Sequence, residues 1–336
     1  MVKMVGRIVL AALLGSQLAA TAQVAGDFQQ WRLAPQAVQP AGNLASPDRV
    51  DLGKMLFYDR RLSGDGKSSC ASCHIPERAW GDGKALAIGF GGKPMRRNSM
   101  SLVNIGYYPG PFMWAGQKAT LEQQVLAPMT HPDIMATDFT GLLAWLNAEP
   151  TYRAKFARAY PGEPIDAATL SKAIANFERS IVSRDTAFDR WLAGSTDAMT
   201  PQQLRGLVLF TSSNKANCAS CHTAPNFSDN GFYNIGLESV DVGRFAVRPV
   251  PILKGAFKVP QLRESLHKAP YMHDGSLATL MDVVQHYNKG GRGGGVGTVS
   301  GGISPLKLTR REQEDLVAFL RALSGPPPLL PAPRLP

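Results

Sequence analysis

The chain has 336 residues and a formal net charge of +10 at pH 7. This length is sufficient for two domains, each with its own hydrophobic core. The positive charge favours an acidic protein partner, whereas nucleic acid is disfavoured because the basic residues are dispersed along the chain.

The first 22 residues have the features of a secretory signal peptide. Lys3 and Arg7 give a positive start, Ile8 to Ala20 an apolar core, and Ala20-Thr21-Ala22 a small-residue cleavage site. The apolar stretch of about 13 residues is too short to span a bilayer, and no later segment qualifies. The sequence therefore predicts an exported protein with no membrane span after cleavage.

The pentapeptide Cys-Ala-Ser-Cys-His occurs twice and uses every cysteine of the chain. The first copy supplies Cys70, Cys73 and His74, and the second supplies Cys218, Cys221 and His222. Two thiols three residues apart lie on one face of a helical turn, so they can form thioethers with both vinyl groups of a haem. The histidine that follows then ligates the iron. We predict two covalently attached haem c groups.

Two other interpretations of these cysteines are weaker. A zinc ribbon places its Cys-x-x-Cys pairs roughly 12 to 20 residues apart, whereas about 144 residues separate these two. A thioredoxin-type dithiol requires neither a second copy nor a following histidine. Because haem attachment of this kind takes place outside the cytoplasm, the motifs and the signal peptide agree on the periplasm. An electron-carrier protein is then the natural acidic partner.

The segments around the two motifs are similar, which indicates an internal repeat. Leu52–Phe57 precedes the first motif as Arg205–Phe210 precedes the second. An aromatic residue and an aspartate follow each motif, and these are Trp80 and Asp82, then Phe227 and Asp229. The repeat predicts two related domains with one haem each.

Two segments show helical periodicity, and each is expected to close one domain. Leu170–Trp191 and Thr309–Leu323 place apolar residues on one face and charged residues beside them. The composition of Gly194–Pro201 indicates a boundary. We expect an N-terminal haem domain over 23–195, a C-terminal haem domain over 196–325 and a disordered Pro-rich tail over 326–336. Alternating strand patterns are scarce, so the predicted fold class is mainly α, with two cytochrome c-like haem domains and long loops.

Beyond the haem motifs, the chain resembles the bacterial diheme cytochrome c peroxidase family, in particular its MauG-like branch. The resemblance runs from about Leu52 to Leu323, and its most specific stretches are Arg97-Asn98-Ser99, Trp114-Ala115-Gly116, Thr120–Gln124 and Ala269–Ser276. It implies that the N-terminal haem binds hydrogen peroxide and that the C-terminal haem stores or relays an electron.

The resemblance also implies a ligand for the second iron. The peroxidase branch has a methionine there, whereas the matching position in this chain is Tyr287, as in the MauG-like branch. A phenolate lowers the potential of the iron and favours Fe(III) and higher states, so this haem is expected to hold oxidising equivalents. The residues alone leave open that Tyr287 is an ordinary helix residue and that another side chain ligates, namely Met272, His273, Met281 or His286.

The first haem site departs from the peroxidase pattern at Phe90. Peroxidases that need reductive activation carry a histidine in a Gly-His-Gly-like loop, and it caps the resting iron. The corresponding stretch here is Gly89-Phe90-Gly91. The resemblance therefore implies an open sixth position on this iron in the resting protein.

A second departure concerns the acid that moves a proton between the peroxide oxygens. The family spacing leads from Trp114 to Gln124 and Pro128 and then to a catalytic glutamate, whose position holds Ile134 in this chain. General acid–base catalysis of this kind contributes roughly 10² to 10⁴ in rate, and isoleucine cannot perform it. Asp133 can replace the glutamate if the loop shifts by one residue, and so can His131; alternatively both are ordinary loop or capping residues.

Two further roles follow from the resemblance. Trp114 would lie between the haems and carry the oxidising equivalent from one to the other, although as a bare sequence feature a tryptophan more often fills a core. Family members hold Ca²⁺ between the domains through an asparagine side chain and two carbonyls. Asn98, Lys268 and Pro270 match, but the lysine replaces the usual threonine, and an ammonium opposes a bound cation.

These features predict a periplasmic diheme cytochrome c peroxidase or MauG-like oxidoreductase that reduces hydrogen peroxide at the N-terminal haem with electrons relayed through the C-terminal haem. The donor is expected to be a small cytochrome c, a copper protein or an oxidised protein side chain. Ala216 stands where one MauG-like member has a functional surface tryptophan, so its maturation role is not expected. A homodimer is left open. The alternative is a diheme electron-transfer protein without peroxidase turnover.

Overall fold

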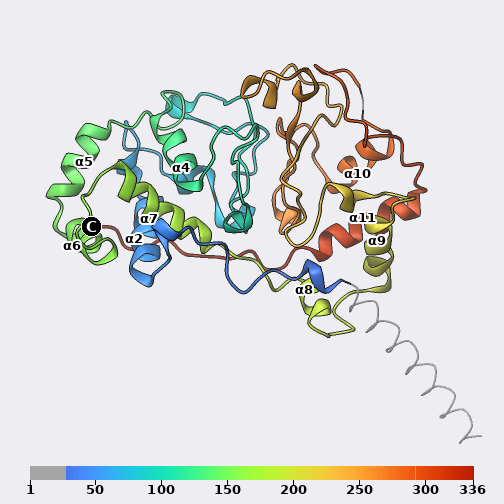
Figure 1. Ribbon diagram of the computed structural model, residues 1–336, viewed down its shortest axis with the longest axis horizontal. Coiled ribbons are helices and arrows are strands. Elements are labelled where there is room, and N and C mark those ends of the chain that lie inside the picture. The colour runs from blue at the N-terminus through green and yellow to red at the C-terminus, as the bar shows by residue number, and fades with distance from the viewer. Residues whose placement is uncertain (1–27, 292) are drawn as a thin grey trace, which may run out of the picture.

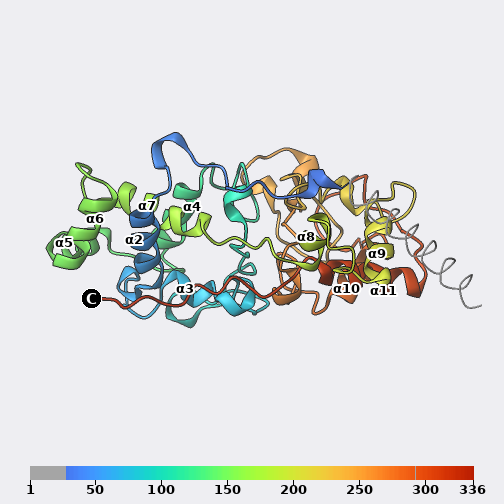
Figure 2. The same ribbon diagram turned by 90° about the horizontal axis from the view of Figure 1, so that it is seen from below.

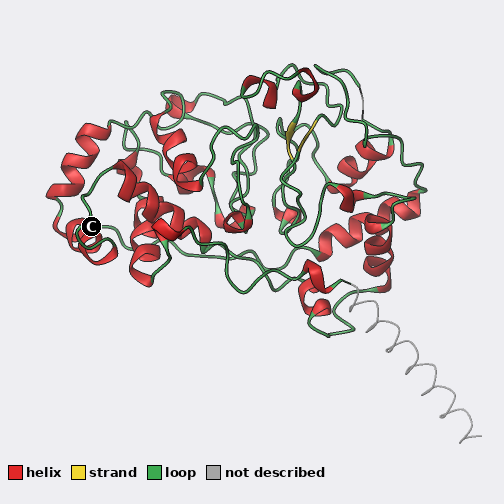
Figure 3. Cartoon of the chain, in the orientation of Figure 1, coloured by secondary structure: helices red, strands yellow, loops and turns green. Residues whose placement is uncertain are grey.

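The computed structural model describes residues 28–291 and 293–336. The signal peptide predicted at 1–22 lies outside these residues. The described chain is mainly helical with long loops, as Figure 3 shows, so the predicted fold class is confirmed. Within the described ranges, no helix is long and apolar enough to cross a membrane.

The helices are short and are distributed along the whole described chain. They are α2 (Pro47–Tyr58), α3 (Cys70–Cys73), α4 (Leu121–Thr130), α5 (Phe139–Ala148), α6 (Pro150–Ala159), α7 (Ala167–Arg179), α8 (Ala187–Leu192), α9 (Pro201–Thr211), α10 (Leu280–Asn288) and α11 (Arg310–Ala322). Strands β1 (Phe232–Tyr233) and β2 (Phe257–Lys258) pair antiparallel. The elements form two lobes side by side, with α2 and α4 to α7 in one and α9 to α11 in the other (Figure 1).

One helix pair forms the centre of each lobe, and a glycine lies at each crossing. Helix α2 packs on α7, and α9 packs on α11. A Cβ on Gly53 would lie 1.9 Å from the carbonyl oxygen of Ala173, and a Cβ on Gly206 would lie 2.0 Å from that of Asp315. A side chain at either position would therefore push the helices apart. The repeated segments seen in the sequence thus set the same helix packing in both lobes.

The same aromatic cluster recurs in both lobes. The ring centroids of Phe57 and Phe177 lie 5.0 Å apart, and those of Phe210 and Phe319 lie 5.2 Å apart. Phe57 and Phe210 also approach the histidine of their haem motif, with centroid distances of 6.4 and 6.5 Å. Each motif histidine is therefore held against a packed aromatic core, which fixes its position relative to the helix pair.

The segment predicted as one helix, Leu170–Trp191, is divided between α7 and α8. Between them the chain is extended, because side-chain and backbone groups of Asn104 replace the helical hydrogen bonds. Its Nδ2 donates to the carbonyl of Ser183 (3.0 Å), and its Oδ1 accepts from the Ser183 amide (2.9 Å). Phe188 and Trp191 of α8 lie in the second core, on the N-terminal side of the boundary expected near Gly194–Pro201.

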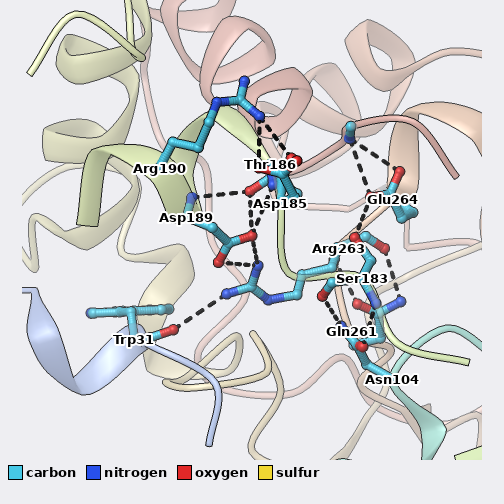
Figure 4. Close-up of polar contacts among 11 residues, drawn as sticks. Trp31, Asn104, Ser183, Asp185, Thr186, Asp189, Arg190, Gln261, Arg263 and Glu264 are labelled. Atoms are coloured by element: carbon cyan, nitrogen blue, oxygen red, sulfur yellow. Dashed lines mark hydrogen bonds and ion pairs between the residues drawn. The ribbon is translucent and has the colours of Figure 1, made fainter. Parts of the chain in front are cut away.

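Polar contacts join this linker and the start of α8 to Arg263 and Glu264, and through Arg263 to Trp31 (Figure 4). The hydroxyl of Ser183 donates to Glu264 (2.5 Å), and Arg263 pairs with Asp189 through its Nη1. The Nη2 of Arg263 donates to the carbonyl of Trp31 (3.3 Å), and Trp31 is buried in the second core. The first described residues therefore belong to the second lobe, and the chain then crosses to α2 in the first, as Figure 2 shows.

The Pro-rich tail, which was expected to be disordered, runs from the second lobe along the first (Figures 1 and 2). The carbonyl of Pro328 accepts a hydrogen bond from Trp80 Nε1 (2.9 Å), and that of Leu330 accepts one from the hydroxyl of Tyr58 (2.7 Å). Leu330 and Leu335 pack against the first core. Prolines restrict the conformations of the unbound tail, so ordering the tail costs less conformational entropy. The composition predicted disorder because it contains no information on these contacts with the first lobe.

Candidate haem sites and the junction between the lobes

The two Cys-Ala-Ser-Cys-His motifs differ in backbone conformation but hold their histidines in the same way. The first forms α3, where Ser69 and Ser72 make a capping box, and the second forms a short 3₁₀ turn at Cys218–Ser220. His74 Nδ1 lies 2.8 Å from the carbonyl of Trp80, and His222 Nδ1 lies 2.9 Å from that of Phe227. A carbonyl only accepts, so each Nδ1 carries the proton and each Nε2 presents a lone pair for a metal.

Burial supports the same chemistry. Desolvation lowers the pKa of His74 and of His222, which keeps both imidazoles in the neutral form that ligates iron. The four cysteines are half-buried and form no disulfide. The spacing of thiols and histidine therefore fits a covalently attached haem in each lobe.

A cavity of about 830 Å³ adjoins the first motif. Its wall includes Cys70, Cys73 and His74. Its volume falls within the range of roughly 300–1,000 Å³ that is usual for small-molecule and cofactor sites. Residues of the second lobe, such as Lys258 and Pro270, also line it, so the cavity reaches the junction between the lobes.

Four of the residues that line this cavity have a buried polar atom with no hydrogen-bond partner among the described residues, namely Gln124, Glu178, Arg263 and Ser265. Two of these atoms are oxygens of longer side chains, Oε1 of Gln124 and Oε2 of Glu178. Buried polar groups are normally paired, so an orphaned acceptor and an orphaned carboxyl oxygen in one cavity indicate that a bound group completes the site. Burial raises the pKa of Glu178 to about 8, so this side chain is a neutral acid at pH 7.

Sequence analysis did not single out Glu178. This glutamate lies between Phe177 and Arg179 among the buried residues of α7. An acidic residue inside an apolar helical stripe is the sequence feature that could have identified it. A second missed residue is Lys258, which is 3% exposed and lines the same cavity. Its ammonium lies 3.1 Å from Oδ1 of Asn230 and 4.9 Å from the ring centroid of Tyr108, and burial lowers its pKa to about 8.

The loop predicted to replace the catalytic glutamate also borders the cavity. Pro128, His131, Asp133 and Ile134 all line it. The Asp133 carboxylate forms an ion pair with Lys93 (3.2 Å), and 49% of its side chain is exposed. The backbone carbonyl of Asp133 accepts from the amide of Phe90 (2.8 Å), which fixes the Gly89–Gly91 turn to this loop. Asp133 therefore lies at the solvent edge of the cavity, whereas Ile134 packs against the first core.

Trp114 connects the two lobes. It lines the cavity, and its Nε1 donates to the carbonyl of Asn98 in the first lobe (2.8 Å). Its own carbonyl accepts from the amide of Lys258 in the second lobe (2.8 Å), and its ring lies edge-on to that of His273 with centroids 6.4 Å apart. The tryptophan is therefore held from both sides, as a residue between two redox centres would have to be.

The residues expected to hold calcium are arranged differently from a cation site. The Oδ1 of Asn98 accepts a hydrogen bond from the ammonium of Lys268 at 2.5 Å. Calcium requires six to eight oxygen ligands, and an ammonium at contact distance from one of them would repel it. The residues present do not fit Ca²⁺.

Tyr287 lies on α10 close to the second haem motif. Burial raises the pKa of its phenol most, and the charges of Cys218 and Cys221 raise it further, which places the side chain near both thiols. Among the alternative ligands, His286 Nε2 lies 2.8 Å from the carbonyl of Ile235, and Met272 lines the first cavity.

The remaining alternatives differ in their surroundings. His273 is stacked on Phe257 with ring centroids 3.5 Å apart, and its Nε2 lies 3.2 Å from the hydroxyl of Ser239. Met281 packs against the second core. The surroundings therefore favour Tyr287 over the histidines as the candidate ligand, and Met281, in the second core, is the alternative to test against it.

Comparisons with known proteins agree with these features. The family model for di-haem cytochrome c peroxidase matches residues 47–197. The methylamine utilization protein MauG of Methylorubrum extorquens is 39% identical over 307 residues, which cover 90% of this chain and 86% of that protein. Cytochrome-c peroxidase IdrP1 of Denitromonas iodatirespirans is 37% identical over 360 residues, covering 96% and 94%.

Solved structures show the same architecture. The crystal structure of a MauG-like protein associated with microbial copper homeostasis covers 87% of this chain and 93% of that one, at 36% identity and a TM-score of 0.80. The diheme peroxidase BthA from Burkholderia thailandensis covers 87% and 90%, at 26% identity and a TM-score of 0.72. The chain belongs to the di-haem cytochrome c peroxidase family, whose members are enzymes with two haem c groups.

Proposed function

We propose that this protein is a periplasmic peroxidase that reduces hydrogen peroxide in the first lobe with electrons delivered through the second. The overall reaction takes up two electrons and two protons and releases two molecules of water. Haem c held by His74 and the two thioethers would supply the iron at which the peroxide bond is reduced. The domains would be the two lobes, each built around one haem motif.

The observation that carries this proposal is a cavity shared by the first haem motif and by Trp114. A substrate in this cavity would lie against one motif, while Trp114 contacts the second lobe through Lys258 and His273. No loop histidine lies in the Gly89–Gly91 turn, so the turn supplies no capping ligand. Peroxide could therefore enter the cavity of the resting protein without a preceding loop movement.

The chain offers two sources of the protons that the reaction needs. Asp133, at the edge of the cavity, has a side chain that is 49% exposed to solvent. Glu178, inside the cavity wall, holds a proton at neutral pH. We retain Asp133 as the residue that replaces the missing glutamate at Ile134, with Gln124 orienting the substrate through its unpaired carbonyl oxygen.

Stopped-flow mixing of the diferric holoprotein with hydrogen peroxide tests the proposal. We expect a rapid change in the haem absorption spectrum, followed by turnover when a reduced small cytochrome c or copper protein is added. Trp114→Phe should retain the reaction with peroxide but slow oxidation of the donor, because the indole between the lobes is lost. Trp145→Phe on α5 is the matched control. An unchanged spectrum on mixing would refute the peroxidase.

Asp133→Ala separates the two proton sources. We expect the peroxide-dependent spectral change to slow by roughly 10²- to 10⁴-fold, the range that one general acid–base residue contributes. Asp138→Ala, on the neighbouring N-cap of α5, is the control. An unchanged rate in Asp133→Ala removes this residue from the mechanism.

The competing function is diheme electron transfer without peroxide turnover. Ile134 favours it, because an apolar side chain lines the cavity where the family places its acid. In that case the diferric protein would exchange electrons with a carrier but would not consume peroxide. The measurement that decides is peroxide consumption in the presence of excess reduced carrier.

The electron donor follows from charge. The net charge of +10 favours an acidic small cytochrome c or copper protein, and association should weaken as ionic strength rises. Oxidation of a protein side chain remains an alternative for the reductant. Ala216, at the position of the surface tryptophan of one MauG-like member, is buried and contributes no redox-active group.

A further inference from the structure

The junction between the lobes is organised around Asn98. All four of its polar groups are engaged. Its amide donates to the carbonyl of His273 (2.7 Å), its Nδ2 donates to the carbonyl of Lys84 (2.5 Å), and its carbonyl accepts from Trp114. The remaining group, Oδ1, accepts from Lys268. Asn98 is 4% exposed, so each of these bonds is made away from bulk water.

The Lys268 side chain fits this place closely. It lies directly over Gly81, where an added Cβ would come within 2.9 Å of its Cδ and Cε and 3.3 Å of its Nζ. The absence of a side chain at Gly81 therefore provides the space in which the Lys268 side chain extends to Asn98. A side chain at position 81 would displace Lys268 from this contact.

The charge of Lys268 is balanced locally. Asp82, which is 8% exposed, is the one carboxylate that holds the pKa of Lys268 up against the desolvation that lowers it. Oδ1 of Asp82 accepts from the amide of Lys84, and its Oδ2 has no hydrogen-bond partner within the described part of the chain. A buried carboxylate without a counter-charge would be costly, and the ammonium supplies one positive charge nearby.

We propose that the ammonium of Lys268 is a built-in cation that takes over the task of calcium at this junction. It fixes the Asn98 side chain, and Asn98 in turn fixes Trp114 and His273 on either side of the boundary between the lobes. A tethered charge cannot dissociate, so the junction is complete at any calcium concentration. Lys268 is thus a positioning residue, and the proposal holds whether or not peroxide is the substrate.

The first test measures calcium in the holoprotein. The protein is dialysed against millimolar CaCl₂, desalted and analysed for metal by mass spectrometry, and its melting temperature and haem spectrum are recorded with CaCl₂ and with EGTA. We expect substoichiometric calcium and identical curves. One calcium per chain, or a change on adding EGTA, would overturn the proposal.

The second test removes the charge. Lys268→Met keeps most of the side-chain volume but leaves Asn98 Oδ1 without its donor and Asp82 without the positive charge beside it. We expect amide hydrogen exchange at Asn98 to accelerate by about tenfold or more, because local opening becomes easier. The exposed Lys254→Met is the control. Unchanged exchange in Lys268→Met would show that the ammonium does not hold the junction.

A third variant guards against a folding defect in Lys268→Met. Gly81→Ala retains the charge and pushes the lysine away from its path, since the added Cβ would meet Cδ and Cε at 2.9 Å. Exchange at Asn98 should accelerate in this variant too, by less than in Lys268→Met, while the exchange of α5 and α6 at the far end of the first lobe stays the same. No acceleration in Gly81→Ala would contradict the proposed path.

Discussion

Arg263 and Asp189 form a buried ion pair in which the Nη1 of the arginine lies 2.7 and 2.6 Å from the two carboxylate oxygens. The arginine side chain is 0% exposed, and the aspartate side chain is 11% exposed. Asp189 lies on α8, directly after the linker, so the pair joins the linker to the segment that lines the junction. The Nη2 of the same arginine donates to the carbonyl of Trp31, which adds the N-terminal segment to this contact.

Arg263→Met should therefore destabilise the protein strongly. Removing one partner leaves a buried carboxylate uncompensated, at a cost of about 3–5 kcal/mol. The measurement is the free energy of unfolding of the holoprotein in denaturant. Arg310→Met is the control, because Arg310 pairs with Glu314 on the surface, where such a pair contributes less than about 0.5 kcal/mol. Equal effects of the two substitutions would contradict this view of the linker.

Tyr287→Phe should change the second haem alone. Loss of the phenol oxygen removes a strongly donating ligand, so the reduction potential of this haem should rise by on the order of 100 mV, within the roughly 0.8 V that axial ligands command. Electron paramagnetic resonance and a redox titration measure the change. Tyr271→Phe, which loses only a hydrogen bond to the carbonyl of Ser265, is the control. If Met281→Leu rather than Tyr287→Phe shifts the potential, methionine is the ligand.

Glu178 should make stability depend on pH. Its pKa is about 8 in the folded protein and near the ordinary 4.5 in the unfolded chain, so between these values the folded state holds one proton more. The free energy of unfolding should therefore fall as pH rises through this range, by at most about 1.4 kcal/mol per pH unit. Glu178→Gln should flatten this slope of stability against pH, and the exposed Glu314→Gln should leave it unchanged. A parallel slope in Glu178→Gln would show that other groups cause it.

The C-terminal tail should contribute to the stability of the first lobe. Leu330 packs against the first core, whereas its neighbour Leu329 is 55% exposed. Leu330→Ala should lower the free energy of unfolding by ~1–2 kcal/mol through lost apolar burial, and Leu329→Ala should have almost no effect. Similar unfolding curves for both variants and the unaltered protein would mean that the tail does not hold the lobe.

The local features of this fold could be predicted because they depend on residues close together in sequence. Thr309 begins the predicted C-terminal helix as an N-cap, and α11 follows it from Arg310 to Ala322. The two haem motifs carry their chemistry within five residues each. The repeated glycines at 53 and 206 also lie in the segments that the internal repeat identified.

The remaining features depend on contacts across the chain. Asn104 interrupts the helix predicted over Leu170–Trp191, because it bonds the backbone of Ser183 in place of helical partners. This residue lies 79 positions away in the sequence, so a local pattern could not reveal the contact. The tail is held because its carbonyls accept hydrogen bonds from the side chains of Trp80 and Tyr58. Glu178 lines the first cavity only because α7 packs on α2. Neither the spacing of residues nor the composition of the chain indicates that these distant segments are in contact.

The exchange of terminal segments between the lobes has a consequence for the order of assembly. Trp31 is translated before the rest of the second core to which it belongs, and Leu330 is translated after the first core against which it packs. Each core therefore requires residues from distant parts of the chain. The first core is thus completed only when the tail, which begins in the other lobe, has been placed along it.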